Sequence, residues 1–276
     1  MRDITIIIPI HKLVQETKDT LQKAVDSVLA NRQTYKNDDG KLKILFVVPT
    51  NFSETTYLNE EYVNKLDDVM IVENNGQTDF CSQVNFGAKY IQENQMSDYF
   101  SILEYDDEFS PKWFQMVNNY YFTNEDVSVF LPVNMQCDAD KTKWQFCNEM
   151  VLATSFSNEL GFIDKDCLEN CTSFNLTGGV FNLKDFIEIG GFKSSIEVAF
   201  NYEFLLRLTN KKYKVYVVPK EGYIHIVGRE DSLMDKYLKT MDNKTIEEWF
   251  NVAKREYTYL EDRKKGIITT KEEKIK

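Results

Sequence analysis

The sequence has few of the residues that disulfide scaffolds and zinc sites require. It contains five cysteines and two histidines among 276 residues. An odd number of cysteines in a chain of this size argues against a disulfide framework. Cys167 and Cys171 have a helix-like spacing, but the scarcity of histidine leaves them without partners for a zinc site. We therefore expect unpaired, mostly buried thiols.

Long apolar runs are also missing. No segment approaches the ~20 apolar residues that a membrane-spanning helix needs. The apolar stretch 4–10 is short for a secretory signal, and no small-residue cleavage site follows it. Internal repeats and low-complexity linkers are absent as well. The sequence predicts a soluble, cytoplasmic protein built as one compact domain.

Basic residues are outnumbered by acidic ones. The chain has 33 Lys plus Arg and 44 Asp plus Glu, which gives a net charge of −11. Such a chain repels nucleic acid and anionic lipid at long range, so non-specific DNA coating is disfavoured. Hydrophobic residues make up 42 %, an ordinary value for a globular protein with a substantial core.

The first half of the chain alternates between strand and helix patterns. Continuous apolar runs rich in β-branched residues predict buried strands, and apolar residues at helical spacing predict the helices between them. This order favours a parallel sheet with helices on both faces and right-handed crossovers, the α/β class. The expected strands are 4–10, 42–48, 69–72 and 99–103, and the expected helices lie around 21–29 and 80–95.

The second half is less regular. We expect strands at 128–131 and 214–218, stopped by Pro132 and Pro219 because proline cannot donate to a sheet. Helices are expected at 202–208 and 235–263. The predicted organisation is one domain over 1–232, followed by a helical C-terminal extension and tail over 233–276.

Four polar motifs follow the four expected strands of the first half. Ligands of parallel sheets bind beyond the carboxyl ends of the strands, so these motifs should meet at one edge. The motifs are Pro9–His11, Pro49–Thr50, Glu73–Gly76 and Glu104–Asp107.

The acidic motif is the strongest candidate for chemistry. Carboxylates that emerge together from a buried strand repel one another, and a divalent cation with oxygen ligands relieves that repulsion. If the backbone stays extended, Glu104 and Asp106 point to the same side and can share one Mn²⁺ or Mg²⁺. The alternative is a solvated acidic loop, which is common on protein surfaces.

The order of these motifs resembles the inverting glycosyltransferases of family two, which have the GT-A fold. No single motif is specific, but five occur in the correct order over residues 3–230. The sequence of residues 201–207 is similar to that of bacteriophage-encoded members. The matching segments are Ile6–Pro9, Leu103–Asp107 with the later aromatic Trp113, Thr177–Phe181, Ile189–Phe192 and Tyr202–Arg207.

The resemblance implies a mostly parallel central sheet flanked by helices and a nucleotide-sugar donor whose diphosphate is bridged by Mn²⁺ or Mg²⁺. The implied metal ligands are Asp106, Glu104 and His225. The implied donor contacts are Pro9, His11, Thr50, Asn74, Asn75, Gly76, Asn85, Tyr105, Asp107 and Arg229. The implied acceptor contacts are Gly178 and Gly179.

Three positions depart from the family pattern. The first metal acid is Glu104 instead of Asp, and Thr50 stands where an acid commonly contacts the nucleotide base. Asn201 occupies the position of the catalytic base, although its amide does not titrate near neutrality. Glu203 is the nearest carboxylate, so Asn201 and Glu203 are the catalytic candidates, with Glu197 and Glu230 in reserve.

The leading hypothesis is therefore a metal-dependent glycosyltransferase that acts on a glycan or on a modified nucleic-acid base, in the host cytoplasm if phage-encoded. A degenerate fold that only binds a sugar or nucleotide is one alternative, motivated by Asn201. A nucleotidyltransferase is another, but the chain lacks a Gly-rich basic loop after its first strand.

Overall fold

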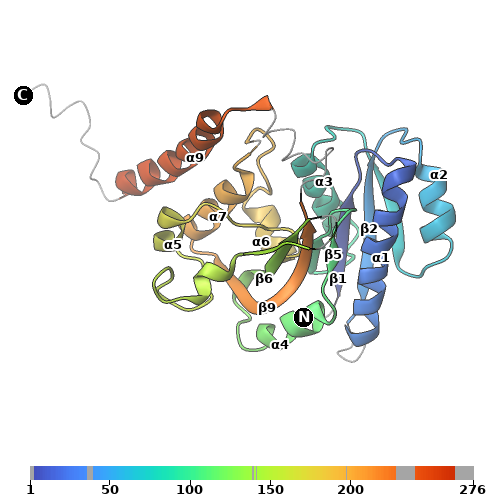
Figure 1. The fold of residues 1–276 in the computed structure, drawn as a ribbon, viewed down its shortest axis with the longest axis horizontal. Coiled ribbons are helices and arrows are strands. Elements are labelled where there is room, and N and C mark those ends of the chain that lie inside the picture. Colours follow the sequence, from blue (N-terminus) through green and yellow to red (C-terminus); the bar gives the residue numbers. More distant parts are fainter. Residues whose placement is uncertain are drawn as a thin grey trace, which may run out of the picture.

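A mixed sheet of nine strands forms the centre of the molecule (Figure 1), in the order β3-β2-β1-β4-β8-β6-β9-β5, with β7 paired to β6. The computed structural model describes residues 3–35, 40–138, 140, 142–196, 198–227 and 240–264. The strands are β1 (Ile4–Pro9), β2 (Leu42–Pro49), β3 (Val69–Asn74), β4 (Tyr99–Ile102), β5 (Glu108–Phe109), β6 (Val127–Cys137), β7 (Trp144–Cys147), β8 (Val180–Asn182) and β9 (Lys214–Ile226).

Helices flank this sheet, and the predicted α/β fold class is confirmed. The helices are α1 (Gln15–Tyr35), α2 (Thr55–Leu58) continued by a π-helical turn (Asn59–Val63), α3 (Phe80–Glu93), α4 (Trp113–Tyr121), α5 (Lys165–Asn170), α6 (Leu183–Glu188), α7 (Phe200–Asn210) and α9 (Asn243–Lys264). A short 3₁₀ turn spans Glu149–Leu152. In the described ranges, no helix combines the length and apolar character needed to cross a membrane.

The first half of the sheet is parallel, as the alternation of strands and helices predicts. Strands β3, β2, β1 and β4 pair in parallel. Successive residues of β1 enter two different cores: Ile7 packs with α3, whereas Ile6 and Ile8 pack with α1. A strand buried on both faces has no polar side, which explains its unbroken apolar sequence.

Strands β6 and β9 run further than their prolines predict. The expectation that Pro132 and Pro219 end these strands is wrong, because both lie in a bulge where Leu131 pairs with Val217 and Val133 with Glu221. A bulge leaves residues unpaired, so the missing proline N–H groups cost no ladder hydrogen bond. Beyond the bulge, β6 continues to Cys137 and β9 to Ile226.

The C-terminal helix α9 lies along α7 at the periphery of the molecule (Figure 1), and a buried ionic network joins them. The Glu203 carboxylate is 0 % exposed and accepts hydrogen bonds from Tyr257 of α9 and Arg207. Its Oε1 lies 2.9 Å from the Lys193 ammonium. Arg207 also donates to the carbonyl oxygens of Ile189 and Gly191. The expected helix over 235–263 is present from Asn243 onward, and its Ala253 and Tyr257 are buried.

We expect Glu203→Gln to destabilise the protein by about 3–5 kcal/mol, because it leaves the buried Arg207 without its counter-charge. Urea unfolding measures this loss. Glu256→Gln is the matched control: Glu256 pairs with the same lysine, Lys193, at 3.4 Å but is 47 % exposed, so we expect a loss of under about 1 kcal/mol. Equal losses in the two variants would show that the buried network does not hold the helices together.

Candidate functional site

The carboxyl ends of the parallel strands converge on one edge, as predicted. Thr50, after β2, donates from its backbone N–H to the carbonyl oxygen of Asn74 at the end of β3, at 3.1 Å. The Asn74 side chain then accepts the N–H of Gly76 at 2.9 Å and closes a tight turn. Thr50, Asn75 and Gly76 are exposed at this edge, where a ligand can reach them.

The end of β1 lies beside the acidic motif that follows β4. Pro9 is buried at the end of its strand, and His11 is exposed just beyond it. The rings of His11 and Tyr105 lie with their centroids 6.2 Å apart. Four segments that are distant in sequence therefore form one continuous edge.

The acidic motif forms a turn and not an extended segment. The N–H of Asp107 donates to the carbonyl oxygen of Glu104 at 3.1 Å, which closes the turn. The extended backbone expected for this motif is therefore wrong, since β4 ends at Ile102. The turn brings Glu104 and Asp107, which are three residues apart, to one side.

Strand β9 supplies the third side chain of the site. Asp107 is 0 % exposed, and its two carboxylate oxygens bind Nδ1 of His225 at 2.7 Å and the N–H of Ile226 at 2.9 Å. The Tyr223 hydroxyl accepts the N–H of Glu104 at 3.1 Å. Alternate residues of β9 therefore position both acids of the turn.

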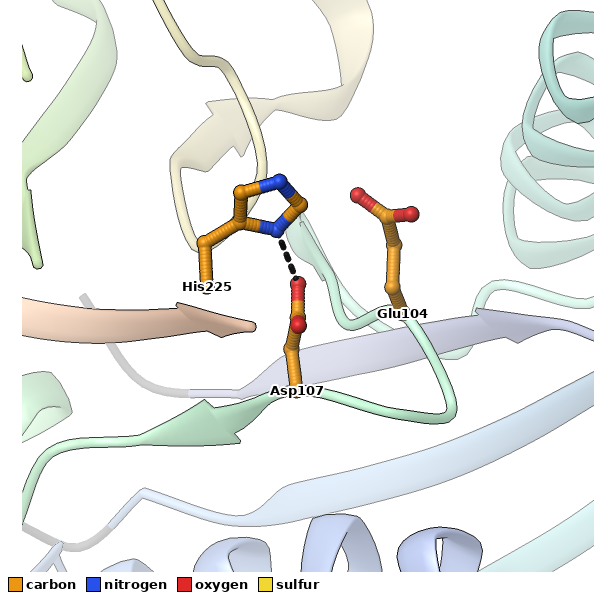
Figure 2. Close-up of side chains that lie close together, drawn as sticks. All are labelled: Glu104, Asp107 and His225. Atoms are coloured by element: carbon orange, nitrogen blue, oxygen red, sulfur yellow. Dashed lines mark hydrogen bonds and ion pairs between the residues drawn. The ribbon is translucent and has the colours of Figure 1, made fainter. Parts of the chain in front are cut away.

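Glu104, Asp107 and His225 form a group that fits a divalent metal (Figure 2). One ligand atom from each lies within 4.8 Å of the other two. Two carboxylates and an imidazole are a donor set that suits Mn²⁺, and Mg²⁺ accepts the carboxylates. Asp106 is half-exposed and lies outside this group, so its role as a ligand stays a prediction.

His225 carries a proton in the metal-free protein. Burial lowers its pKa, but the ion pair and hydrogen bond with Asp107, together with Glu104 and Asp106, raise the pKa from 6.5 to about 9. This surplus of negative charge around one imidazole is what a bound cation would neutralise in place of the proton.

A protein-family model matches more than half of the sequence. The model of glycosyl transferase family 2 matches residues 5–184. This chain belongs to glycosyl transferase family 2. No curated protein sequence matches it. The matched range ends before β9, so the family model does not cover His225; the structure brings this residue, which the sequence resemblance already implied as a ligand, beside Glu104 and Asp107.

Solved structures with the GT-A-type transferase fold resemble the chain at low sequence identity. Staphylococcus aureus TarS 1–349 in complex with UDP has a TM-score of 0.59 and 13 % identity over 84 % of this chain and 62 % of its own. Mannosyltransferase PcManGT from Pyrobaculum calidifontis, with GDP-Man and Mn²⁺, has a TM-score of 0.59 and 14 % identity over 83 % and 58 %. GalNAc-T7 with UDP, GalNAc and Mn²⁺ has a TM-score of 0.56 and 14 % identity over 83 % and 44 %. The chain thus spans less than two thirds of these relatives.

Asn85, expected to contact the donor, instead anchors a loop. Its side-chain oxygen accepts the N–H of Phe192 at 2.8 Å, and its Nδ2 donates to the carbonyl oxygen of Phe192 at 2.7 Å. Both functions of the amide are satisfied within the protein. The structure therefore gives Asn85 a positioning role for the Gly190–Phe192 segment, and donor contact stays a prediction.

Neither base candidate on α7 offers a free carboxylate. Asn201 is half-buried and donates to the carbonyl oxygen of Phe174 at 3.4 Å. Glu203 is sealed by Arg207, Lys193 and Tyr257, which leaves its carboxylate no access to a substrate hydroxyl. This geometry speaks against Glu203 as the base. Glu197, Arg229 and Glu230 lie outside the described residues.

Gly178 and Gly179 lie close to other residues of the protein. Gly178 has φ +78°, and a Cβ there would lie 2.5 Å from the Tyr223 ring; at Gly179 it would meet Leu131 at 2.8 Å. The Gly178 carbonyl oxygen accepts the indole N–H of Trp113 at 2.9 Å. Both glycines are buried; Gly178 lies against Tyr223 and Gly179 against Leu131, and direct acceptor contact stays a prediction.

We expect the metal-free protein to lose stability as pH rises through 9. The folded-state pKa of His225 lies above its unfolded value of 6.5, so its stabilising contribution is complete below pH 6.5 and is lost through pH 9. The loss is about 3 kcal/mol. Urea unfolding in EDTA from pH 6 to 10 should show this fall, which His225→Gln should flatten. His11→Gln, at the exposed histidine, should keep it; a parallel loss in both variants would contradict the assignment.

Proposed function

We propose that this chain is a metal-dependent glycosyltransferase that moves a sugar from a nucleoside-diphosphate donor to an acceptor hydroxyl. The carrying observation is the group Glu104, Asp107 and His225, which stands at the carboxyl edge of the parallel strands. That edge is where ligands of such sheets bind. Mn²⁺ or Mg²⁺ held there would stabilise the departing nucleoside diphosphate.

The exposed edge supports the donor side of the proposal. Thr50, Asn75, Gly76 and His11 border an open surface next to the acidic turn. A nucleoside lying over β1–β3 would place its diphosphate at Glu104–Asp107. Two similar structures, PcManGT and GalNAc-T7, hold a nucleotide or nucleotide-sugar together with Mn²⁺, which agrees with this arrangement. Thr50 replaces the acid that commonly contacts the nucleotide base, so the donor panel described below is used to identify the nucleotide.

Asp107 and Tyr223 hold the metal-binding turn in place. Both carboxylate oxygens of Asp107 bind groups of β9, and the Tyr223 hydroxyl accepts a hydrogen bond from the backbone N–H of Glu104. Desolvation raises the pKa of the Tyr223 hydroxyl far above 10, aided by the negative charges of Asp107 and Glu104, so it stays protonated. Asp106, half-exposed in the turn, is proposed as an additional contact to the metal or the diphosphate.

A second candidate function is donor binding without transfer. Its supporting observation is the chemistry of α7, where an amide, Asn201, occupies the base position and Glu203 is enclosed by its partners. Direct inversion needs a group that removes the acceptor proton. Donor turnover therefore separates the two candidates.

We expect Mn²⁺ together with one donor from a panel of UDP-, GDP- and TDP-sugars to raise the melting temperature of the wild type. Asp107→Asn should remove this shift because it halves the acidic charge that binds the cation and breaks the contact with His225. Glu104→Gln is a milder change and should lower the Mn²⁺ affinity at least about tenfold. Thermal shift and calorimetry give both quantities.

The matched control is Glu93→Gln, an exposed acid at the end of α3 on the opposite edge of the sheet. It should leave the donor response unchanged. A donor shift that needs no metal, or that survives in both site variants, contradicts the metal assignment. Donor stabilisation with no released nucleoside diphosphate in any condition would favour the binding module.

A further inference from the structure

The metal-binding face continues from β9 onto a two-stranded extension made by β6 and β7. Beyond the proline bulge, Gln136 of β6 pairs with His225 of β9. On its other side, Gln136 pairs with Gln145 of β7. His225, Gln136 and Gln145 therefore form a row across three neighbouring strands.

Paired residues on adjacent strands point to the same face of a sheet, so both glutamines share the face of His225. That face carries the metal-binding group, because His225 binds Asp107 there. Neighbouring strands lie about 4.8 Å apart, which places the two amides roughly 5 and 10 Å from His225 along the row. One or two sugar rings span that distance.

The amides of this row are available to a ligand. Neither Gln136 nor Gln145 makes a side-chain hydrogen bond to another described residue; Gln136 is half-buried and Gln145 is exposed. Two residues before Gln136 on β6, Asn134 is 0 % exposed. Its side-chain N–H donates to the Thr177 carbonyl oxygen, while its Oδ1 has no partner among the described residues. Asn134 is sealed from solvent, so the two glutamine amides are the groups that a ligand can reach on this face.

The chemistry of the row selects the class of that occupant. Each amide offers both donors and an acceptor, which matches hydroxyl groups that also donate and accept. Gln136 and Gln145 are uncharged, and the metal group beside them contains two carboxylates. A phosphate backbone needs basic contacts and would be repelled here. Neutral, polyhydroxylated molecules fit best.

We propose that the face of β6 and β7 that carries Gln136 and Gln145 is the acceptor subsite and that the acceptor is a neutral glycan. The proposal rests on the proposed function, since an acceptor presupposes a transferase. It identifies Gln136 and Gln145 as residues that determine acceptor specificity. Gln136, nearest to His225, contacts the sugar that receives the transfer, and Gln145 contacts the next sugar outward.

The test is direct binding to an array of neutral oligosaccharides, sulfated and sialylated oligosaccharides, and a DNA duplex with 5-hydroxymethylcytosine, with Mn²⁺ and each of UDP, GDP and TDP in turn. The wild type should bind neutral members. Gln136→Leu and Gln145→Leu, which keep the side-chain size but remove its hydrogen bonds, should each weaken binding about tenfold. Phe146→Leu is the control: Phe146 neighbours Gln145 on the same strand, is 43 % exposed, and points to the opposite face.

The donor thermal shift, measured on the same variants, separates the two proposals. An intact donor shift in wild type and both glutamine variants keeps the proposed function independent of the acceptor result. Binding only to DNA or anionic glycans, no binding to any neutral member, or equal losses in all three variants would overturn the subsite. Absence of a donor shift with glutamine-dependent glycan binding would overturn the transferase and keep the glycan site.

Discussion

The buried carboxylate of Asp107 is the interaction on which the site depends. One oxygen accepts the N–H of Ile226 and the other binds His225, so a single side chain joins the turn after β4 to the end of β9. Burying a carboxylate is costly unless it is paired and hydrogen-bonded. The end of β9 supplies both partners, and the turn thereby acquires a fixed shape.

The rest of the architecture delivers β9 to that carboxylate. Pro132 and Pro219 share one bulge, which lets β6 and β9 continue past residues that would otherwise end them. Gly222 leaves room for Trp113, since a Cβ there would lie 2.4 Å from the indole. Trp113 in turn binds the Gly178 carbonyl oxygen, and Gly178 lies against Tyr223. These contacts fix the strand that carries Tyr223 and His225.

Local patterns predicted the parallel half of the fold and the edge where its motifs meet, because buried strands such as β1 have unbroken apolar sequences. They failed where the outcome depended on distant partners. No local signal shows that residues 104–107 turn, or that Asp107 finds the Ile226 N–H, so the sequence favoured Asp106 over Asp107. Likewise, Glu203 resembles an exposed helix acid until Lys193 and Tyr257 enclose it.

We propose that His225 completes a metal site with the acidic turn. Pulsed electron paramagnetic resonance of Mn²⁺ bound in the presence of a nucleoside diphosphate tests it directly, because a coordinated imidazole couples its ¹⁴N nucleus to the metal. We expect ¹⁴N coupling in the wild type and its loss in His225→Gln. Bound Mn²⁺ without ¹⁴N coupling in the wild type, or with the same coupling in the variant, would contradict it.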